Sequence, residues 1–209
     1  MNPTYSKAEE KLNIYSHALG LCLSVVALPF LILKAVNYED IWQTLAFFIY
    51  GISLMFLYAA STFYHAATQP ILRRKLNIID HAAIYILIAG TYTPYTLIPL
   101  NGVTGWILFS CTWVFAFLGV LLKIFFTGKF DKLSTILYVL MGWQIVFAMN
   151  PLKNNTSFEA LQFLFIGGVF YTIGAVLYSI KKIPYNHAIF HLFVLLGSVS
   201  HFLSIYLYL

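Results

Sequence analysis

The stretch QTLAFFIYGISLMFLYAASTFYHA, residues 43–66, contains no Asp, Glu, Lys or Arg. It is long enough to cross a bilayer, because a transmembrane helix needs about 20 mainly apolar residues. Similar charge-poor runs follow one another along the chain, and we expect membrane-spanning helices at 17–36, 43–66, 79–99, 104–124, 132–149, 158–180 and 187–208. The predicted fold class is therefore an all-α integral membrane protein, a bundle of seven transmembrane helices.

The overall composition supports the same fold class. Of the 209 residues, 61% are hydrophobic and only 9% are charged, whereas soluble domains contain about 25% charged residues. Seven spans occupy nearly the whole chain, so we expect one transmembrane domain, 1–209, in which residues 1–16 form a short N-terminal segment on the cytoplasmic side. We expect no cleavable signal, because Glu9 and Glu10 precede the first apolar run and this run is long enough to remain as an anchor.

The net charge of +5 comes from basic residues that stand in short segments between the apolar runs. In such loops Lys and Arg mark the cytoplasmic side of the membrane, so the charge does not predict nucleic-acid binding. Lys34 and Lys153 fall on one side of the predicted bundle. The other ten fall on the opposite side: Lys7, Lys11, Arg73, Arg74, Lys75, Lys123, Lys129, Lys132, Lys181 and Lys182. This distribution predicts a cytoplasmic N-terminus and a C-terminus outside.

Several ionisable or hydroxyl side chains lie inside the predicted spans, near one boundary. His187 and His191 are four residues apart and so share one helical face, where both imidazoles can reach a single metal. Ser61 and His65 repeat this spacing at the end of the second span, and Asp80 opens the third. Counted from the basic segments at 1.5 Å per residue, His65, His187 and Asp80 each lie roughly 7–12 Å into the membrane.

Three neutral imidazoles with one open position are typical of catalytic zinc sites. We therefore predict that His65, His187 and His191 bind Zn²⁺, that Asp80 orients or deprotonates a water there, and that Ser61 lies beside it. The alternative is that each histidine is a hydrogen-bonded packing residue and that Ser61 only links two helices. Convergence from three helices at one depth favours the metal, although the same ligands also suit iron or another divalent ion.

Other polar residues are predicted to lie outside the metal site. His81 is about 100° around its helix from Asp80, so the two do not share an ion. His201 lies 14 residues after His187, about 21 Å further along, where a structural or water-path role is expected. Near the N-terminus, three residues form one helical stripe that is either a solvated helix start or a polar cap over the cytoplasmic mouth: Glu10, Asn13 and His17.

Together these motifs resemble the hemolysin III family, the bacterial branch of the progestin and adiponectin receptor superfamily. The resemblance runs from residue 10 to 202 and depends on the combination of Glu10-x-x-Asn13-x-x-Ser16-His17, Ser61-x-x-x-His65, Asp80-His81, His187-x-x-x-His191, Gly197 and His201-Phe202. It implies seven helices, a cytoplasmic N-terminus, a bacterial plasma-membrane location and zinc held by His65, His187 and His191.

The resemblance also implies roles for the two remaining site residues. In the adiponectin receptors, the aspartate matching Asp80 and the serine matching Ser61 lie beside the zinc-bound water. Those receptors are similar in turn to alkaline ceramidases, which hydrolyse lipid amides.

The leading hypothesis is a zinc-dependent membrane hydrolase that acts on a lipid amide or ester and so on membrane lipid homeostasis. Its partners are membrane lipids and a lipid substrate or fatty acid, and no oligomeric state is predicted. One alternative is the cytolytic pore implied by the family name, which spans that are apolar all round disfavour. A second is a receptor with a structural zinc. Membrane di-iron desaturases are a poor match, because they need more histidines than the six present.

Overall fold

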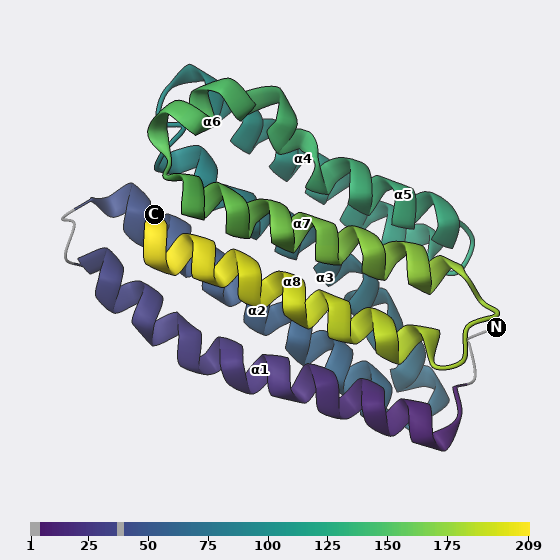
Figure 1. The fold of residues 1–209 in the computed structure, drawn as a ribbon. Coiled ribbons are helices and arrows are strands. Elements are labelled where there is room, and N and C mark those ends of the chain that lie inside the picture. Colours follow the sequence, from purple (N-terminus) through teal and green to yellow (C-terminus); the bar gives the residue numbers. More distant parts are fainter. Residues whose placement is uncertain (1–4, 37–39) are drawn as a thin grey trace.

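The computed structural model describes residues 5–36 and 40–209, so the first four residues of the N-terminal segment lie outside the described part. These residues form helices joined by short turns, and the long helices run side by side along one direction (Figure 1). The elements are α1 Lys7–Val36, α2 Ile41–Ala66, α3 Pro70–Leu97, α4 Val103–Phe126, α5 Asp131–Gly142, the 3₁₀ helix η1 Gln144–Ala148, α6 Met149–Asn155, α7 Phe158–Ser179 and α8 Asn186–Tyr208.

Within the described residues, six segments are long and apolar enough to cross a membrane: α1, α2, α4, Lys132–Asn155, α7 and α8. The helix α3, with 28 residues, is also long enough, but its second half carries Thr and Tyr side chains. Every residue from Ala89 to Leu97 is buried, and α3 packs against α2, α4, α5 and α8. Its polar surface therefore faces other helices. The molecule is a membrane helical bundle with α3 at its centre.

Two helices begin earlier than the predicted spans. The structure starts α1 at Lys7 and α3 at Pro70, whereas spans beginning at 17 and 79 were expected. Pro70 suits the first turn of a helix, where no backbone N–H is needed. Arg73 and its basic neighbours consequently lie on the first turns of α3 and not in a loop. Hydropathy marks only the part of a helix inside lipid, so it misses polar turns that continue the same helix.

The predicted span 132–149 falls within the apolar segment Lys132–Asn155, but the structure divides this segment into α5, η1 and α6. The break is made by Tyr92 of α3. Its hydroxyl donates to the carbonyl of Gly142 at 2.8 Å and accepts from the N–H of Ile145 at 2.8 Å. A side chain thus takes the place of helical backbone partners. Pro151 lies near the start of α6, where proline is tolerated.

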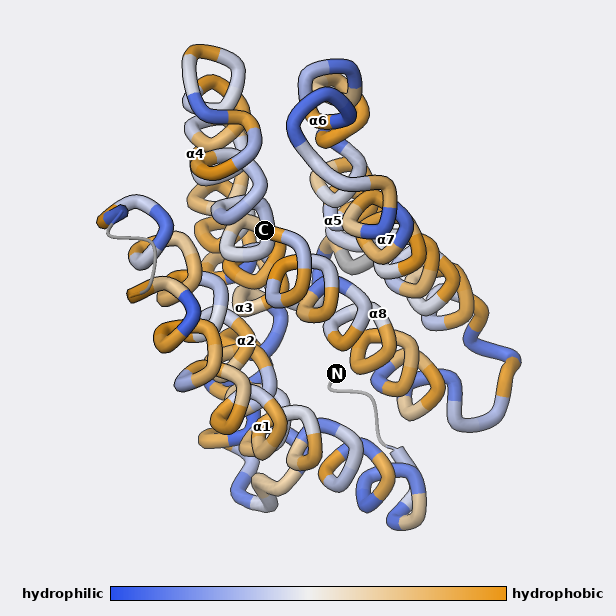
Figure 2. The backbone as a smooth tube through the Cα atoms, turned by 60° about the vertical axis from the view of Figure 1, so that its left-hand side comes forward, coloured by the Kyte–Doolittle hydropathy of each residue, from blue (hydrophilic) through white to orange (hydrophobic). Residues whose placement is uncertain are grey.

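The polar ends of the helices gather at the two ends of the bundle (Figure 2). The starts of α1, α3 and α8 and the turn between α4 and α5 share one end (Figure 1), and this end carries the ten basic residues predicted on one side. At the other end, the Lys34 ammonium donates to the carbonyls of Tyr206 at 2.6 Å and Ile205 at 3.4 Å. A cation there stabilises the C-terminus of α8, which explains one exception to the charge distribution.

Hydrogen bonds between buried hydroxyl groups hold the bundle together at mid-length. Ser198 of α8 bonds to the hydroxyl of Tyr58 at 2.8 Å and to that of Tyr171 at 2.7 Å. The Tyr171 ring lies so close to α8 that a Cβ atom on Gly197 would be 2.7 Å from it. Small residues permit this approach between membrane helices. Ser198 therefore joins α2, α7 and α8 through one oxygen atom.

We predict that Ser198→Ala lowers the unfolding free energy by about 1 kcal/mol, because two buried phenols lose a partner. The midpoint of thermal unfolding in detergent should fall by about 2–4 °C. Ser200→Ala is the matched control, since among the described residues its hydroxyl bonds only to the Leu196 carbonyl of its own helix, at 2.9 Å. Equal midpoints for the two variants would contradict this account of the interior.

Candidate metal centre and its cavity

The three predicted ligands come together at one point. His65 stands at the end of α2, and His187 and His191 occupy successive turns at the start of α8. All three are at least 96% buried. They offer ligand nitrogens within 4.8 Å of one another, and the Nε2 atoms of His65 and His187 are 3.1 Å apart. The described residues therefore contain a three-histidine cluster that could bind a metal ion.

The hydrogen bonds of two of these rings determine which nitrogen faces the centre of the cluster. The Nδ1 atom of His65 lies 2.7 Å from a carboxylate oxygen of Glu10, and that of His191 lies 3.3 Å from the carbonyl of Asn13. Both acceptors require a proton on Nδ1, which leaves the lone pair on Nε2. Nitrogens around a tetrahedral zinc, each bound at about 2.0–2.1 Å, lie roughly 3.3 Å apart. The 3.1 Å between the Nε2 atoms of His65 and His187 is close to this separation, and the donor set could bind a metal ion.

Aromatic rings enclose the cluster. The His17 ring stacks on His191 with centroids 3.5 Å apart, and the Tyr5 ring stacks on His187 at 4.7 Å. Burial raises the pKa of the Tyr5 phenol above its usual value, so its hydroxyl stays protonated. Asn13 and His17 are both at least 97% buried. The solvated-helix interpretation of this stripe is therefore wrong, and α1 packs its polar face against the cluster.

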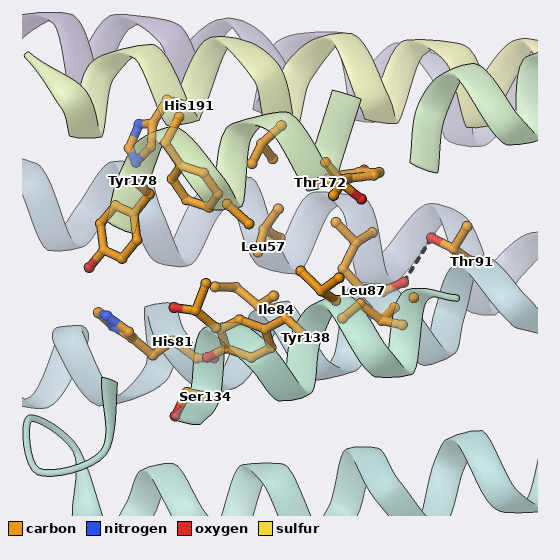
Figure 3. Close-up of a pocket in the computed structure, with 18 of the residues that line it drawn as sticks. Leu57, His81, Ile84, Leu87, Thr91, Ser134, Tyr138, Thr172, Tyr178 and His191 are labelled. Atoms are coloured by element: carbon orange, nitrogen blue, oxygen red, sulfur yellow. Dashed lines mark hydrogen bonds between the residues drawn. The ribbon is translucent and has the colours of Figure 1, made fainter. Parts of the chain in front are cut away.

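A cavity of about 140 Å³ begins at the cluster and extends between α3, α5, α7 and α8. His191, Tyr178 and His81 lie near one end of it, while Leu57 and Leu87 line its length (Figure 3). The lining continues along α8 to His201, about 21 Å from His187. The cavity is thus elongated, with a mainly apolar wall, and has histidines at both ends.

The two predicted catalytic residues lie in the wall of the same cavity. Asp80 and Ser61 line it together with His187 and His191. The Ser61 hydroxyl is fully buried and has no hydrogen-bond partner within the described part of the chain. Asp80 is 8% exposed, and its carboxylate lies 3.8 Å from the Nδ1 atom of His81. Both oxygen-bearing groups are therefore available to a molecule that occupies the cavity.

The two histidines predicted to lie outside the metal site are absent from the three-histidine cluster of the described residues. His81 donates from Nδ1 to the carbonyl of Asn77 at 2.9 Å, one turn earlier in its own helix. His201 donates from Nε2 to the carbonyl of Leu164 at 3.0 Å. His201 therefore links α8 to α7 at the far end of the cavity.

Lys123 is a cavity residue that sequence reasoning missed. It was assigned to the topology signal between two spans, but the structure places it on α4, with 1% exposure, in the cavity wall. A lysine at the end of an apolar run looks the same in sequence whether it faces water or the interior.

Tyr5 could not be predicted as a site residue either, because it precedes the first helix and belongs to no spaced motif.

The comparisons with known proteins cover almost the whole chain. The family model described as Haemolysin-III related matches residues 5–202, a range that contains every residue of the cluster and the cavity. The chain belongs to the haemolysin III family. Its relatives include the Hemolysin-3 homolog of Bacillus subtilis (strain 168), which is 44% identical over 200 residues, covering 96% of this chain and 94% of the relative.

Two further relatives extend the comparison. Hemolysin-3 of Bacillus cereus is 42% identical over 200 residues, covering 96% of this chain and 91% of its own length. The Homo sapiens protein named Monocyte to macrophage differentiation factor is 28% identical over 213 residues, with 96% and 84% covered. This haemolysin III protein is therefore a multi-pass membrane protein whose relatives extend to animals.

We predict that the purified haemolysin III protein retains about one equivalent of divalent metal, because three neutral imidazoles converge on one point. His191→Ala should reduce the metal content to background. His81→Ala is the control and should leave it unchanged, since His81 lies outside the cluster. Elemental analysis after size-exclusion chromatography measures both. Equal metal content in the two variants would contradict the assignment of the ligands.

Proposed function

We propose that this haemolysin III protein is a zinc-dependent membrane hydrolase that cleaves a lipid amide or ester and thereby takes part in membrane lipid homeostasis. The observation that carries the proposal is that two histidines of the three-histidine cluster, His187 and His191, line an elongated and mainly apolar cavity. A metal bound by the histidines could then act on a carbonyl group of a molecule whose hydrocarbon chain occupies the cavity.

Zinc held by His65, His187 and His191 would lower the pKa of a bound water and polarise a carbonyl group. Asp80 is the base that takes the proton from the attacking water, because it is the carboxylate in the cavity wall near the histidines. Ser61 has an unpartnered hydroxyl in the same wall. This hydroxyl donates to the oxygen of the carbonyl as negative charge develops there.

The cavity supports a lipid as the substrate. Beyond the histidines its wall contains Leu57, Ile84, Leu87 and Val194, whose apolar surfaces are matched by an acyl chain. The cavity is elongated, which suits an extended chain with its amide or ester bond near His187 and His191. A fatty acid is then one of the products, and its chain occupies the same space.

We further propose that the chain crosses the bacterial plasma membrane seven times, with α3 as the seventh spanning helix. The N-terminus is then cytoplasmic and the C-terminus outside. Ten basic residues at one end of the bundle support this orientation, and α1 begins at the end opposite the one where α8 finishes (Figure 1). The metal centre would lie at the depth of the inner leaflet.

The orientation predicts the accessibility of engineered cysteines. In a background where Cys22 and Cys111 are replaced by serine, Asn154→Cys should react with a membrane-impermeant maleimide on intact cells. Lys182→Cys should react only after permeabilisation, because it belongs to the basic end of the bundle. The reverse pattern of labelling would overturn the orientation.

The hydrolase proposal predicts that Asp80→Asn lowers the rate of fatty-acid release at least about 100-fold while the metal remains bound, because only the base is lost. The matched control is Asp40→Asn. Asp40 caps α2 by accepting from the N–H of Trp42, and asparagine caps equally well. The control should therefore retain the wild-type rate. The assay follows fatty-acid release from amide and ester lipids by protein reconstituted in nanodiscs.

Other outcomes of this assay point to other functions. Equal rates for Asp80→Asn and the wild type would overturn the role of Asp80. Leakage of dye from vesicles with no fatty-acid release would favour lysis, the activity named in the Bacillus cereus relative. Saturable binding of a ligand with no turnover, in a protein that unfolds without its metal, would favour a receptor with a structural zinc.

A further inference from the structure

A carboxylate from α1 contacts one of the three histidines directly. Glu10 accepts a hydrogen bond from His65 Nδ1 through one oxygen, at 2.7 Å. Its other oxygen accepts from a guanidinium nitrogen of Arg73. The Glu10 side chain is 20% exposed and the His65 side chain is fully buried. The carboxylate therefore stands at the edge of the cluster, between a buried imidazole and a cation.

Arg73 in turn holds the helix end that carries His65. Its guanidinium donates to the carbonyls of Tyr64 at 3.3 Å, His65 at 3.4 Å and Ala67 at 3.2 Å. It also lies over the Tyr64 ring, 4.8 Å from the centroid. The last carbonyls of a helix lack helical partners, and Arg73 supplies partners to those of α2. Backbone and side chain of His65 are thus fixed by one connected network.

The three ligands are not supported equally. His65 is oriented by Glu10, and His191 is oriented by the Asn13 carbonyl at 3.3 Å and the Ser16 hydroxyl at 3.4 Å. All these supports belong to α1, which packs against both α2 and α8. The Nδ1 atom of His187 has no hydrogen-bond partner within the described residues. The polar turns of α1 are therefore the element that brings ligands from two other helices into register.

We propose that Glu10 is a positioning residue of the metal centre. Its carboxylate selects the His65 tautomer that presents Nε2 to the metal, fixes the plane of the ring and raises the basicity of the imidazole. Arg73 keeps the carboxylate charged and pointed at His65. This inference rests on the proposed metal site, and it adds a determinant of metal affinity that lies on α1, outside the cluster of ligands.

If Glu10 had only a structural role, a different result would be expected. If the ion pair only joined α1 to the end of α2, its loss would lower thermal stability but leave metal affinity unaltered once the protein is folded. If Glu10 positions His65, its loss weakens metal binding by the folded protein and changes the ligand geometry. Metal affinity and the spectrum of a bound metal therefore separate the two roles without any measurement of catalysis.

The test compares the full-length wild type, Glu10→Gln and Glu9→Gln in nanodiscs. Glu9 is a matched control, because it carries the same charge one residue away and its carboxylate forms no ion pair within the described part of the chain. Zinc affinity is measured by competition with a chelator, and the ligand geometry by the visible absorption of bound Co²⁺. We expect Glu10→Gln to weaken zinc binding about 10–100-fold and to shift the cobalt bands. Glu9→Gln should match the wild type.

The outcomes distinguish this inference from the proposal on which it rests. If the wild type binds no zinc, the metal site itself fails. If the wild type binds zinc and Glu10→Gln binds it equally well with the same cobalt spectrum, the site stands and the positioning role is overturned. Should Glu10→Gln not fold, Glu10→Asp repeats the test by keeping the charge while the shorter side chain withdraws the carboxylate from His65, with an expected loss of zinc affinity of at least about threefold.

Discussion

Three imidazoles that belong to two helices are held at one buried point by the first turns of a third. Within a membrane, such polar groups are costly unless each finds a partner. Here Glu10 and the Asn13 carbonyl accept from two of the rings, and the Nε2 atoms of His65 and His187 lie 3.1 Å apart. The register of α1 against α2 and α8 therefore decides whether the cluster forms, and the rest of the site depends on it.

The same packing produces the cavity. α3 lies at the centre of the bundle and presents Asp80 near the histidines and Leu87 further along. Tyr92 of the same helix interrupts the helical backbone after Gly142, so the chain bends beside the cavity. The polar groups near the histidines and the apolar wall of the cavity therefore both depend on how α3 packs. This arrangement is the basis of the proposal that the substrate is a lipid.

Much of the site could be predicted from the sequence because its determinants are local. The spacing of four between His187 and His191 fixes a helical face, and the distance of His65 from the nearest basic residues fixes its depth. The contribution of α1 was only partly predictable. The stripe of Glu10, Asn13 and His17 was visible, but nothing in its spacing showed whether it faced water or the cluster.

Other features could not be read from the sequence, because they depend on contacts between distant segments. The break after Gly142 is made by a tyrosine fifty residues earlier, and no local turn signal marks it. In the sequence, Lys123 cannot be distinguished from a lysine that faces water at the end of a span, and only the packing of α4 shows that it is buried. α3 contains enough polar residues to fall outside the apolar spanning segments, and only its burial among other helices explains how these residues are accommodated.

X-ray absorption at the zinc edge of the zinc-loaded protein tests the central claim most directly, because it reports the atoms bound to the ion. The account predicts one zinc with three imidazole nitrogens at about 2.0–2.1 Å and a fourth light atom. In the His65→Ala variant one imidazole contribution should be missing. A spectrum of zinc surrounded by six oxygens, or one unchanged by His65→Ala, would contradict the claim that these three histidines bind a single metal ion.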